Sequence, residues 1–511
     1  MIRCPAAIAG LLLLCRVATA GSTFDVRDYG AAGDGMKKDT AALQKAIDAA
    51  AEHGGIVLVP AGRYLSGTIH LRSDVTLSLS PGSVILASPD EADFDAYEKL
   101  PFQSVSDKET TYFHYGLVTA ENVHDIAIIG EGVIDGNRTK RGGPKTVAIK
   151  LCQRVTIRGV TVRNSPNYSI SFWGCDYVNV DGVNVLNGYA DGIDPDSSRF
   201  VRISNSYIDA WDDAICPKAS PSMGMDQKRA VENLTVTNCV LRTNCSNFKF
   251  GTESSGDFRN IAVSNLVMLP RDTGRPPISG ISLEAVDGAH IQGVVISNIS
   301  MQGVRVPIFL RLANRGRGLD PKVAGGLEDV SISNVMVRDA TTPSSITGIP
   351  GSRVRHVSLD GIHTSFTGGV KEPGGLGVDE FVEKYPEGTM WGVLPAWALY
   401  VRHADGISIR NFDGRWSQED ARPAAIFDDV TDLTLDAFRP SSASGSGPVL
   451  WLNDVAGALI ESARPAASQV FLRASGAKSK GIAMSGNDLS RSQRAYDAQP
   501  GVIAVLDAKS K

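Results

Sequence analysis

The chain has 511 residues, of which 42% are hydrophobic, 21% are charged and 52 are glycine. This composition is typical of a globular protein and excludes a disordered chain. The formal net charge is −5 and no basic block is present, which argues against nucleic acid as a partner. The length allows several ordinary domains or one elongated repeat domain.

The first twenty residues predict a cleaved export signal. Arg3 supplies a positive charge, residues 5–15 form an apolar core, and residues 18–20 (Ala-Thr-Ala) form a small-residue cleavage site. Arg16 interrupts the apolar run well before the roughly 20 residues that a membrane span needs. We therefore expect an exported protein, periplasmic or secreted, that has no membrane partner. The five cysteines left after cleavage are expected either to form one or two disulfides or to stay buried as free thiols.

Residues 24–55 predict a short helix that covers the first strands. Asp39 or Thr40 can cap this helix, and Gly54 with Gly55 would end it. The apolar residues expected on its buried face are Leu43, Ile47 and Ala50. A helix in this place would protect the open edge of the first strands from pairing with other chains.

A motif of alternating apolar residues interrupted by a small residue or asparagine recurs along the chain. Its copies begin at Val155, Val178, Val201, Leu234, Ile261, Val294, Val330, Val357 and Ile407. Alternation within copies and a period of 23 residues or more predict a parallel β-helix, whose coils stack at about 4.8 Å with asparagine ladders along the axis. Longer intervals, such as residues 219–233 and 315–328, are expected to wall a binding groove. Residues 21–440 would form this domain, and residues 441–511 a flexible break, possible last coils and a loose tail.

Three aspartates, Asp191, Asp212 and Asp213, lie about one coil apart in YADGIDPD and DAWDDAIC, so neighbouring rungs can bring them together. Because adjacent strand residues face opposite sides, we expect a bulge at residues 212–213. Three close carboxylates repel one another, which raises the pKa of at least one. Glycoside hydrolysis uses such a division, with one carboxylic acid and one carboxylate that activates water. Aspartates that merely close turns and a calcium site are the alternatives.

These motifs, together with FDVRDYGAAGDG (24–35) and NSPNYSISFWGC (164–175), resemble the family 28 glycoside hydrolases, the polygalacturonase family, over nearly all of the mature chain. The resemblance implies an all-β fold, a single-stranded right-handed parallel β-helix of the pectin lyase-like kind, with a short N-terminal capping helix. It also implies that Asp212 is the general acid, that Asp191 and Asp213 position the attacking water, and that Lys218 lines the substrate site. The expected reaction is inverting, with acid and base carboxyls about 6.5–9.5 Å apart.

Two of the family's motifs are altered in this sequence. Ser246 stands in place of the histidine of G-H-G, and Ser282 and Glu284 stand in place of the two cations of R-I-K that hold a galacturonate carboxylate. A carboxylate at that place would repel a uronate. Either Lys249 replaces the missing cations, or the sugar is neutral and Glu253 and Glu284 bind its hydroxyl groups.

Several other residues are weaker candidates for the substrate site. His114 could reach the cleft, and Arg311 with its neighbours could either recognise an acidic sugar or form ordinary loop pairs. Exposed aromatic residues could stack on sugar faces, although packing in a late coil is the alternative for Trp391, Trp397 and Tyr400. No histidine spacing predicts a metal site, and no cofactor is expected.

The predicted function is inverting hydrolysis of a glycosidic bond in a pectin-type or related polysaccharide or oligosaccharide, by a monomer. One alternative is a carbohydrate-binding β-helix without activity, and another is a polysaccharide lyase. A hydrolase produces new reducing ends, a lyase produces an unsaturated sugar, and a binding protein produces neither.

Overall fold

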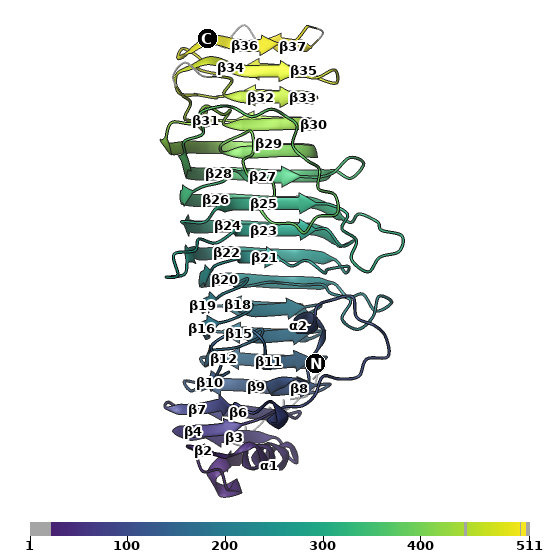
Figure 1. Cartoon of the computed structure of the whole chain (residues 1–511), viewed down its shortest axis with the longest axis vertical. Helices are drawn as coiled ribbons and strands as arrows, with labels where there is room; N and C mark the ends of the chain where they lie inside the picture. Colours follow the sequence, from purple (N-terminus) through teal and green to yellow (C-terminus); the bar gives the residue numbers. More distant parts are fainter. Residues whose placement is uncertain (1–21, 444–446, 501, 507–511) are drawn as a thin grey trace, which may run out of the picture.

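The computed structural model describes residues 22–443, 447–500 and 502–506. Strands stack as rungs along one long axis, with α1 at one end and β36 (Ser492–Ala498) and β37 (Ile503–Leu506) at the other (Figure 1). The strand pairs are parallel, and the fold is the predicted right-handed parallel β-helix. The predicted export signal lies outside the described residues. Within the described ranges, no helix is long and apolar enough to cross a membrane.

The repeated sequence motif fixes the register of the stack. The strands that carry it are β12 (Gln153–Arg158), β15 (Asp176–Asp181), β18 (Arg199–Ser204), β20 (Val231–Thr243), β22 (Phe258–Pro270), β24 (His290–Gln302), β26 (Gly326–Ala340), β28 (Val354–Gly368) and β29 (Leu399–Gln418). The first residue of each predicted copy pairs with the first residue of the next, from Val155–Val178 to Val357–Ile407. These side chains are buried, so the alternation predicted which face of each strand enters the core.

The predicted asparagine ladder is present on an outer corner of the helix. Its members are Asn205, Asn238, Asn265, Asn298 and Asn334, all with φ between 52° and 57°. Each Nδ2 from the second member onward donates to Oδ1 of the preceding asparagine at 3.1–3.3 Å. Asparagine suits this corner because it tolerates the left-handed conformation and can bond its neighbours in the stack.

The capping helix α1 spans Thr40–Ala51 and buries Leu43 and Ile47 against the first coil, as predicted. Asp39 precedes it, but its side chain makes no capping bond to the helix. Its carboxylate instead accepts from the backbone N–H groups of Ala32 and Gly33, at 2.7 and 3.0 Å. Asp39 therefore fixes the preceding turn, which fits its 1% exposure.

One face of the helix carries the short strands on which the candidate site lies. Strands β5 (Ile69–His70), β8 (Gly116–Glu121), β11 (Lys145–Lys150), β14 (Ile170–Trp173) and β17 (Ile193–Asp196) form a five-stranded sheet. Single bridges from Ile193 to Ile215 and from Ile215 to Phe248 extend the row across the next coil. It continues in β21 (Ser246–Phe250), β23 (Ser279–Ala285), β25 (Val306–Leu312) and β27 (Ser344–Thr347).

Two long segments cross this face, and we call them the N-side strap (residues 88–115) and the C-side strap (residues 369–398) (Figure 1). The N-side strap contains α2 (Lys108–Thr111), and its Phe113 packs on Ala148 and Trp173. The C-side strap descends from β28–β29 and is held by Arg311, which donates to the carbonyls of Glu380 and Phe381.

Strands beyond residue 440 continue the same stack. β32 (Leu450–Asn453) and β33 (Ala456–Glu461) pair with β30 (Ala425–Asp436), and β34 (Ser468–Ser475) pairs with β32. The β-helix therefore extends past the boundary placed at 440, into the region where final coils were one expectation. The five described cysteines are free, and four of them are buried: Cys152, Cys175, Cys216 and Cys239.

Candidate functional site

A break in coil register lies directly before the aspartate cluster. In β16 (Asn184–Gly188) and β19 (Tyr207–Ala210), Val185 pairs with Ile208 but Gly188 pairs with Ala210. One coil therefore has one residue more than the next, and a single-residue shift turns the following side chains to the other face. The extra residue lies between Val185 and Gly188, in the coil of Asp191, so this irregularity is not the bulge predicted at residues 212–213.

The three predicted aspartates share one cleft. One carboxylate oxygen of Asp191 lies within 4.8 Å of one of Asp213, and the same holds for Asp212 and Asp213. The backbone N–H of Asp213 donates to Oδ1 of Asp191 at 3.2 Å and to Oδ1 of Asp212 at 3.1 Å. The clustering inferred from one-coil spacing is present in the structure.

Asp191 is held by a buried lysine. Lys218 Nζ lies 2.7 Å from Oδ2 of Asp191 and 3.0 Å from Oδ1 of Asp194, and these side chains are at most 8% exposed. The Tyr168 ring lies 4.1 Å from the same ammonium. Burial raises the pKa of Asp191 and brings that of Asp194 to about 6, while Lys218 opposes both rises. Lys218 is thus a clamp on the carboxylates.

Asp213 is held by a second buried lysine, Lys249. Its Nζ lies 3.1 Å from Oδ2 of Asp213 and 3.8 Å from Oε2 of Glu284. It also donates to the hydroxyl of Tyr385 on the C-side strap, at 3.3 Å. Burial raises the pKa of Glu284 to about 7, although Lys249 and a 2.6 Å hydrogen bond from Ser282 oppose the rise. Lys249 is therefore engaged with protein carboxylates.

Asp212 has a different environment, since its side chain is 27% exposed. Its carboxylate accepts from Arg141, which extends from the loop between β10 (Val133–Asp135) and β11. The same guanidinium pairs with Glu109 of α2. Burial would raise the pKa of Asp212, but Arg141 and Lys249 outweigh it and lower the pKa below its usual value. In the free protein, Asp212 is therefore an ion-paired carboxylate.

The straps close the cleft along the axis of the helix. On the β11–β14 side, Thr110 of α2 bonds Tyr168 at 3.1 Å, and Phe113 covers the sheet beyond. On the other side, Tyr385 covers Lys249 and Glu284. The remaining space is about 430 Å³, open solvent included. The site is a cleft on the β-helix face that the straps narrow and that stays open to solvent at Asp212 and Arg141.

Glu253 joins both sides of the pocket mouth. Arg317, from the loop after β25, pairs with Glu253 and with Asp107 of the N-side strap, the latter at 2.8 Å. Burial and the neighbouring Asp107 raise the pKa of Glu253 to about 7. Glu253 lines the pocket as expected, and its partners come from loops far apart in sequence.

The other predicted residues occupy supporting or separate places. Ser246 donates its backbone N–H to Oδ1 of Asp213 at 3.0 Å, so it fixes a catalytic candidate. Arg311 is 1% exposed beneath the C-side strap, where it bonds backbone carbonyls. His114 lies 2.7 Å from Glu121 in a separate hollow beyond Phe113. Arg311 thus makes the loop contacts that were its alternative interpretation, and His114 lies outside the cleft that contains the three aspartates.

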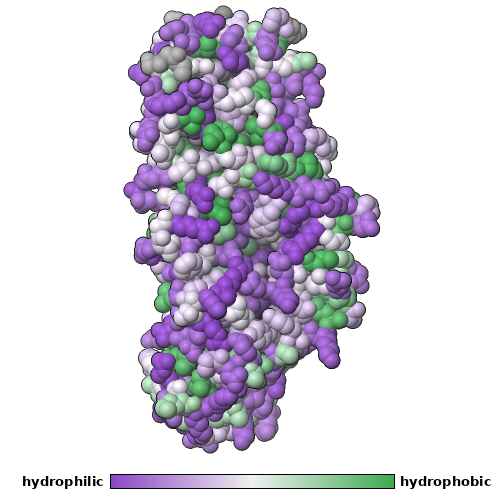
Figure 2. Space-filling view, viewed as in Figure 1, coloured by the Kyte–Doolittle hydropathy of each residue, from purple (hydrophilic) through white to green (hydrophobic). Residues whose placement is uncertain are grey.

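The aromatic candidates are mainly packing residues. Trp397 is 1% exposed in the central core, and Tyr400 is fully buried in a smaller cluster. Trp391 packs on that smaller cluster and covers Arg311, with 5.4 Å between the ring centroid and the guanidinium. Figure 2 shows a mostly hydrophilic face with small, separate apolar areas.

Sequence reasoning missed Arg141 and Tyr385. Both lie on loops outside the repeated motif, and their contacts span 71 and 136 residues of sequence. The only local signal for Arg141 was a basic residue followed by Gly142 and Gly143 at the end of a coil.

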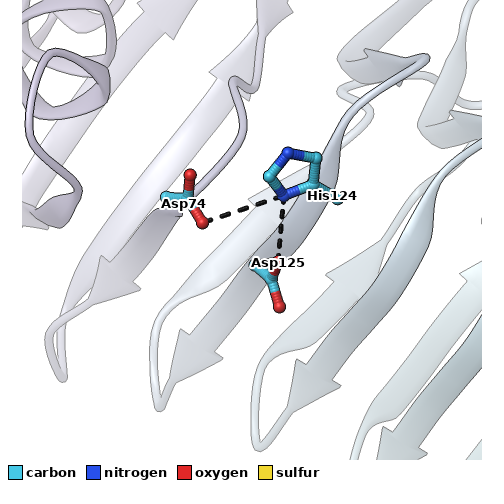
Figure 3. Close-up of side chains that lie close together, drawn as sticks. All are labelled: Asp74, His124 and Asp125. Atoms are coloured by element: carbon cyan, nitrogen blue, oxygen red, sulfur yellow. Dashed lines mark hydrogen bonds and ion pairs between the residues drawn. The ribbon is translucent and has the colours of Figure 1, made fainter.

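An additional charged cluster lies at an outer turn, away from the cleft (Figure 3). Nδ1 of His124 lies 2.9 Å from Asp125 and 3.8 Å from Asp74. Asp125 also accepts two hydrogen bonds from Arg154, both at 2.6 Å, which lower its pKa to about 2. Since Arg154 occupies both oxygens of Asp125, the cluster is a surface ion-pair group.

Comparisons with known proteins agree with this fold. A family described as "Rhamnogalacturonase A/epimerase, pectate lyase-like" matches residues 23–251. A probable polygalacturonase of Vitis vinifera is 23% identical over 66% of this chain and 72% of its own length. An exo-poly-alpha-D-galacturonosidase of Dickeya chrysanthemi is 26% identical over 65% of each chain, so less than two thirds of that relative is covered. A family 28 exopolygalacturonase of Yersinia enterocolitica has the same fold, with a TM-score of 0.59, 20% identity and coverage of 77% of this chain and 76% of its own.

Proposed function

We propose that this chain, which is similar to the polygalacturonase-like glycoside hydrolases of family 28, hydrolyses glycosidic bonds of a pectin-type polysaccharide. The observation that carries the proposal is the division of environments among three clustered aspartates. Asp191 and Asp213 are clamped by buried lysines, while Asp212 faces the open side of the cleft.

In the proposed reaction, Asp212 donates its proton to the glycosidic oxygen as the bond from that oxygen to C1 breaks. A water molecule held by Asp191 and Asp213 forms the new bond to C1 and gives up a proton to one of these carboxylates. Ion pairs with Lys218 and Lys249 hold the Asp191 and Asp213 carboxylates in place for this step. Attack from the face opposite the leaving group inverts C1.

The two straps support cleavage at chain ends. A polymer that is cut internally must leave the cleft in both directions along the groove. Here Phe113 packs over the sheet on one side, and Tyr385 lies against Lys249 on the other. We therefore propose that the enzyme removes terminal units, so that polygalacturonate digests contain monomers or short oligomers from the first turnovers.

The decisive experiment compares the wild type, Asp212→Asn and Asp181→Asn on polygalacturonate and other pectic oligosaccharides. Asp181 is a matched control, because it is an outer-turn aspartate bonded to Ser204 and Asn205. We expect Asp212→Asn to release reducing ends at least about 10³-fold more slowly than the wild type. One acid–base group contributes roughly 10²- to 10⁴-fold to the rate. Asp181→Asn should keep nearly full activity.

Product analysis by mass spectrometry and absorbance separates the alternatives. Saturated products with new reducing ends support the hydrolase. An unsaturated product would show a lyase, and binding without products would show a carbohydrate-binding β-helix. An exported enzyme would meet such polymers outside the cell, which agrees with the signal predicted at residues 1–20.

A further inference from the structure

Arg141 differs from the other cations of the cleft in its exposure. Of the lysines and arginines that line the cleft within the described residues, Lys218 and Lys249 are 8% and 6% exposed, whereas Arg141 is 45% exposed. Each lysine also lies between two buried carboxylates. Moving either ammonium toward a ligand would leave buried charges unpaired, which costs several kcal/mol. Arg141 is the most exposed cation that lines the cleft, while Arg317 at the pocket mouth is 33% exposed and pairs with Glu253 and Asp107.

The present partner of Arg141 conflicts with the chemistry proposed for Asp212. A general acid must carry a proton when the substrate is bound, yet a guanidinium at hydrogen-bonding distance favours the ionised carboxylate. Glu109 also accepts from Arg141, through Nε and Nη2, so the guanidinium can keep one carboxylate while it exchanges the other. The resting contact therefore holds Asp212 in the inactive protonation state.

We propose that Arg141 is the binding site for the carboxylate of an acidic sugar, and that this carboxylate replaces Asp212 as the partner of the guanidinium. The inference rests on the proposed function, because it assigns the substrate class of that site. Binding of a uronate would free Asp212 to take up a proton, so that only an acidic sugar completes the catalytic arrangement. Arg141 acts as a specificity-determining and positioning residue.

The groups that face Asp212 determine its protonation state after this exchange. They are Asp191 from the preceding coil, the adjacent Asp213, Lys249 from β21, and Cys245. Glu109 of α2 pairs with the same guanidinium as Asp212. Once Arg141 is engaged elsewhere, two of the groups that face Asp212 are carboxylates and only Lys249 is a cation. Burial and these carboxylates then favour the protonated form of Asp212.

The exchange also accounts for the altered motifs. Ser282 and Glu284 lie where the family has two cations, and Lys249 is committed to Asp213 and Glu284. Arg141 would supply the missing charge from the β10–β11 loop, on the open side of the pocket. An arginine suits this role because its planar fork binds a carboxylate through two parallel hydrogen bonds.

The first test measures binding of D-galacturonate and D-galactose by calorimetry, because neither sugar needs to be cleaved. The wild type should bind galacturonate about 10- to 100-fold more tightly than galactose, the range for a charged hydrogen-bonded contact. Arg141→Gln should remove this preference, and Arg141→Lys should keep part of it. The control is Arg138→Gln on the same loop, which loses its pair with Glu91 and should keep the full preference.

The second test is the pH dependence of kcat/KM on trigalacturonate, which reports the pKa values of the free enzyme. Activity requires protonated Asp212, so it falls as the pH rises through that pKa. Removing Arg141 raises the pKa of Asp212, and the alkaline limb should therefore move to higher pH in Arg141→Gln but not in Arg138→Gln.

The two proposals fail in distinguishable ways. An Arg141→Gln variant that still prefers galacturonate, or whose alkaline limb does not move, overturns the role of Arg141 even if hydrolysis is confirmed. A wild type that hydrolyses no pectic substrate overturns the proposed function. Loss of the galacturonate preference in Arg141→Gln would support the carboxylate site in that case as well.

Discussion

Two corners of the β-helix show how a regular stack and a functional site differ. At the outer corner, five asparagines from Asn205 to Asn334 repeat the same left-handed backbone and the same side-chain bond. At the second corner, Asn164 and Asn187 begin an equivalent ladder, with φ of 51° and 55° and a 3.0 Å bond between them. The next coil has no asparagine at this corner. It is one residue shorter before Ala210 than the preceding coil is before Gly188.

The second ladder ends in the residues of the cleft. Trp211 Nε1 donates to Oδ1 of Asn187 at 3.2 Å, an oxygen that also accepts from Arg271, and Asp212 and Asp213 follow directly. At the first corner, each asparagine side chain bonds the equivalent asparagine of the next coil. At the second corner this repeat ends, and the carboxylates that follow it pair with lysine and arginine side chains from other coils. Stability at the cleft therefore depends on particular ion pairs, whereas stability at the ladder is shared among similar units.

The largest effect on stability is expected from breaking the pairs of Lys249. Lys249→Met leaves the buried carboxylates of Asp213 and Glu284 without their ammonium partner. We expect the free energy of unfolding at pH 7 to fall by about 3–5 kcal/mol, measured by urea denaturation. The control Lys322→Met removes an exposed pair with Glu383 and should cost no more than about 1 kcal/mol.

Adding Glu284→Gln to Lys249→Met tests the cause of this loss. The second substitution removes one of the two unpaired charges, so the double variant should recover part of the lost stability. Equal stabilities for Lys249→Met and Lys322→Met would show that the cleft does not depend on its buried pairs.

The same contrast explains what the sequence could predict. Val and Ile at a period of one coil identified the strands and their register, because each coil repeats the same inward positions. Asn298 and its equivalents were visible for the same reason, and Asp191 and Asp212 were paired by one-coil spacing. Contacts between residues that do not recur once per coil could not be predicted in this way.

The unpredicted contacts are those made by loops. Arg141 reaches Asp212 across 71 residues, and Tyr385 reaches Lys249 across 136. Their positions depend on the paths of the β10–β11 loop and the C-side strap, which the apolar alternation does not encode. For this reason Lys249 could be proposed as a free cation from the sequence, although the structure places it between two carboxylates.

A smaller effect is expected in the pH dependence of stability. Burial raises the pKa of Glu284 to about 7 in the folded protein, against about 4.3 in an unfolded chain. The folded state binds the proton of the Glu284 carboxyl more tightly than the unfolded state does. The resulting stabilisation of the folded protein is complete below about pH 4 and is lost as the pH rises toward 7. The difference corresponds to about 4 kcal/mol.

Unfolding free energies of the wild type and Glu284→Gln between pH 4 and 8 measure this contribution. The wild type should lose stability relative to Glu284→Gln as the pH rises, and exposed Glu52→Gln should show no such trend. A constant difference between the wild type and Glu284→Gln would contradict the raised pKa.

The smallest effect is expected at the ladder, where Asn265 is the central member. Its Nδ2 donates to Asn238 at 3.2 Å, and its Oδ1 accepts from Asn298 at 3.1 Å. Asn265→Ala loses these bonds and a weaker one from Nδ2 to Thr237, and it forces alanine into a left-handed conformation, for a total cost of about 2 kcal/mol. Asn265→Gly loses the same bonds but adopts φ of 56° freely, although glycine loses more backbone entropy. We expect glycine to be the more stable variant by roughly 0.5–1 kcal/mol, with hydrolysis unchanged in both. If alanine is at least as stable as glycine, the side-chain bonds rather than the backbone conformation account for asparagine at this corner.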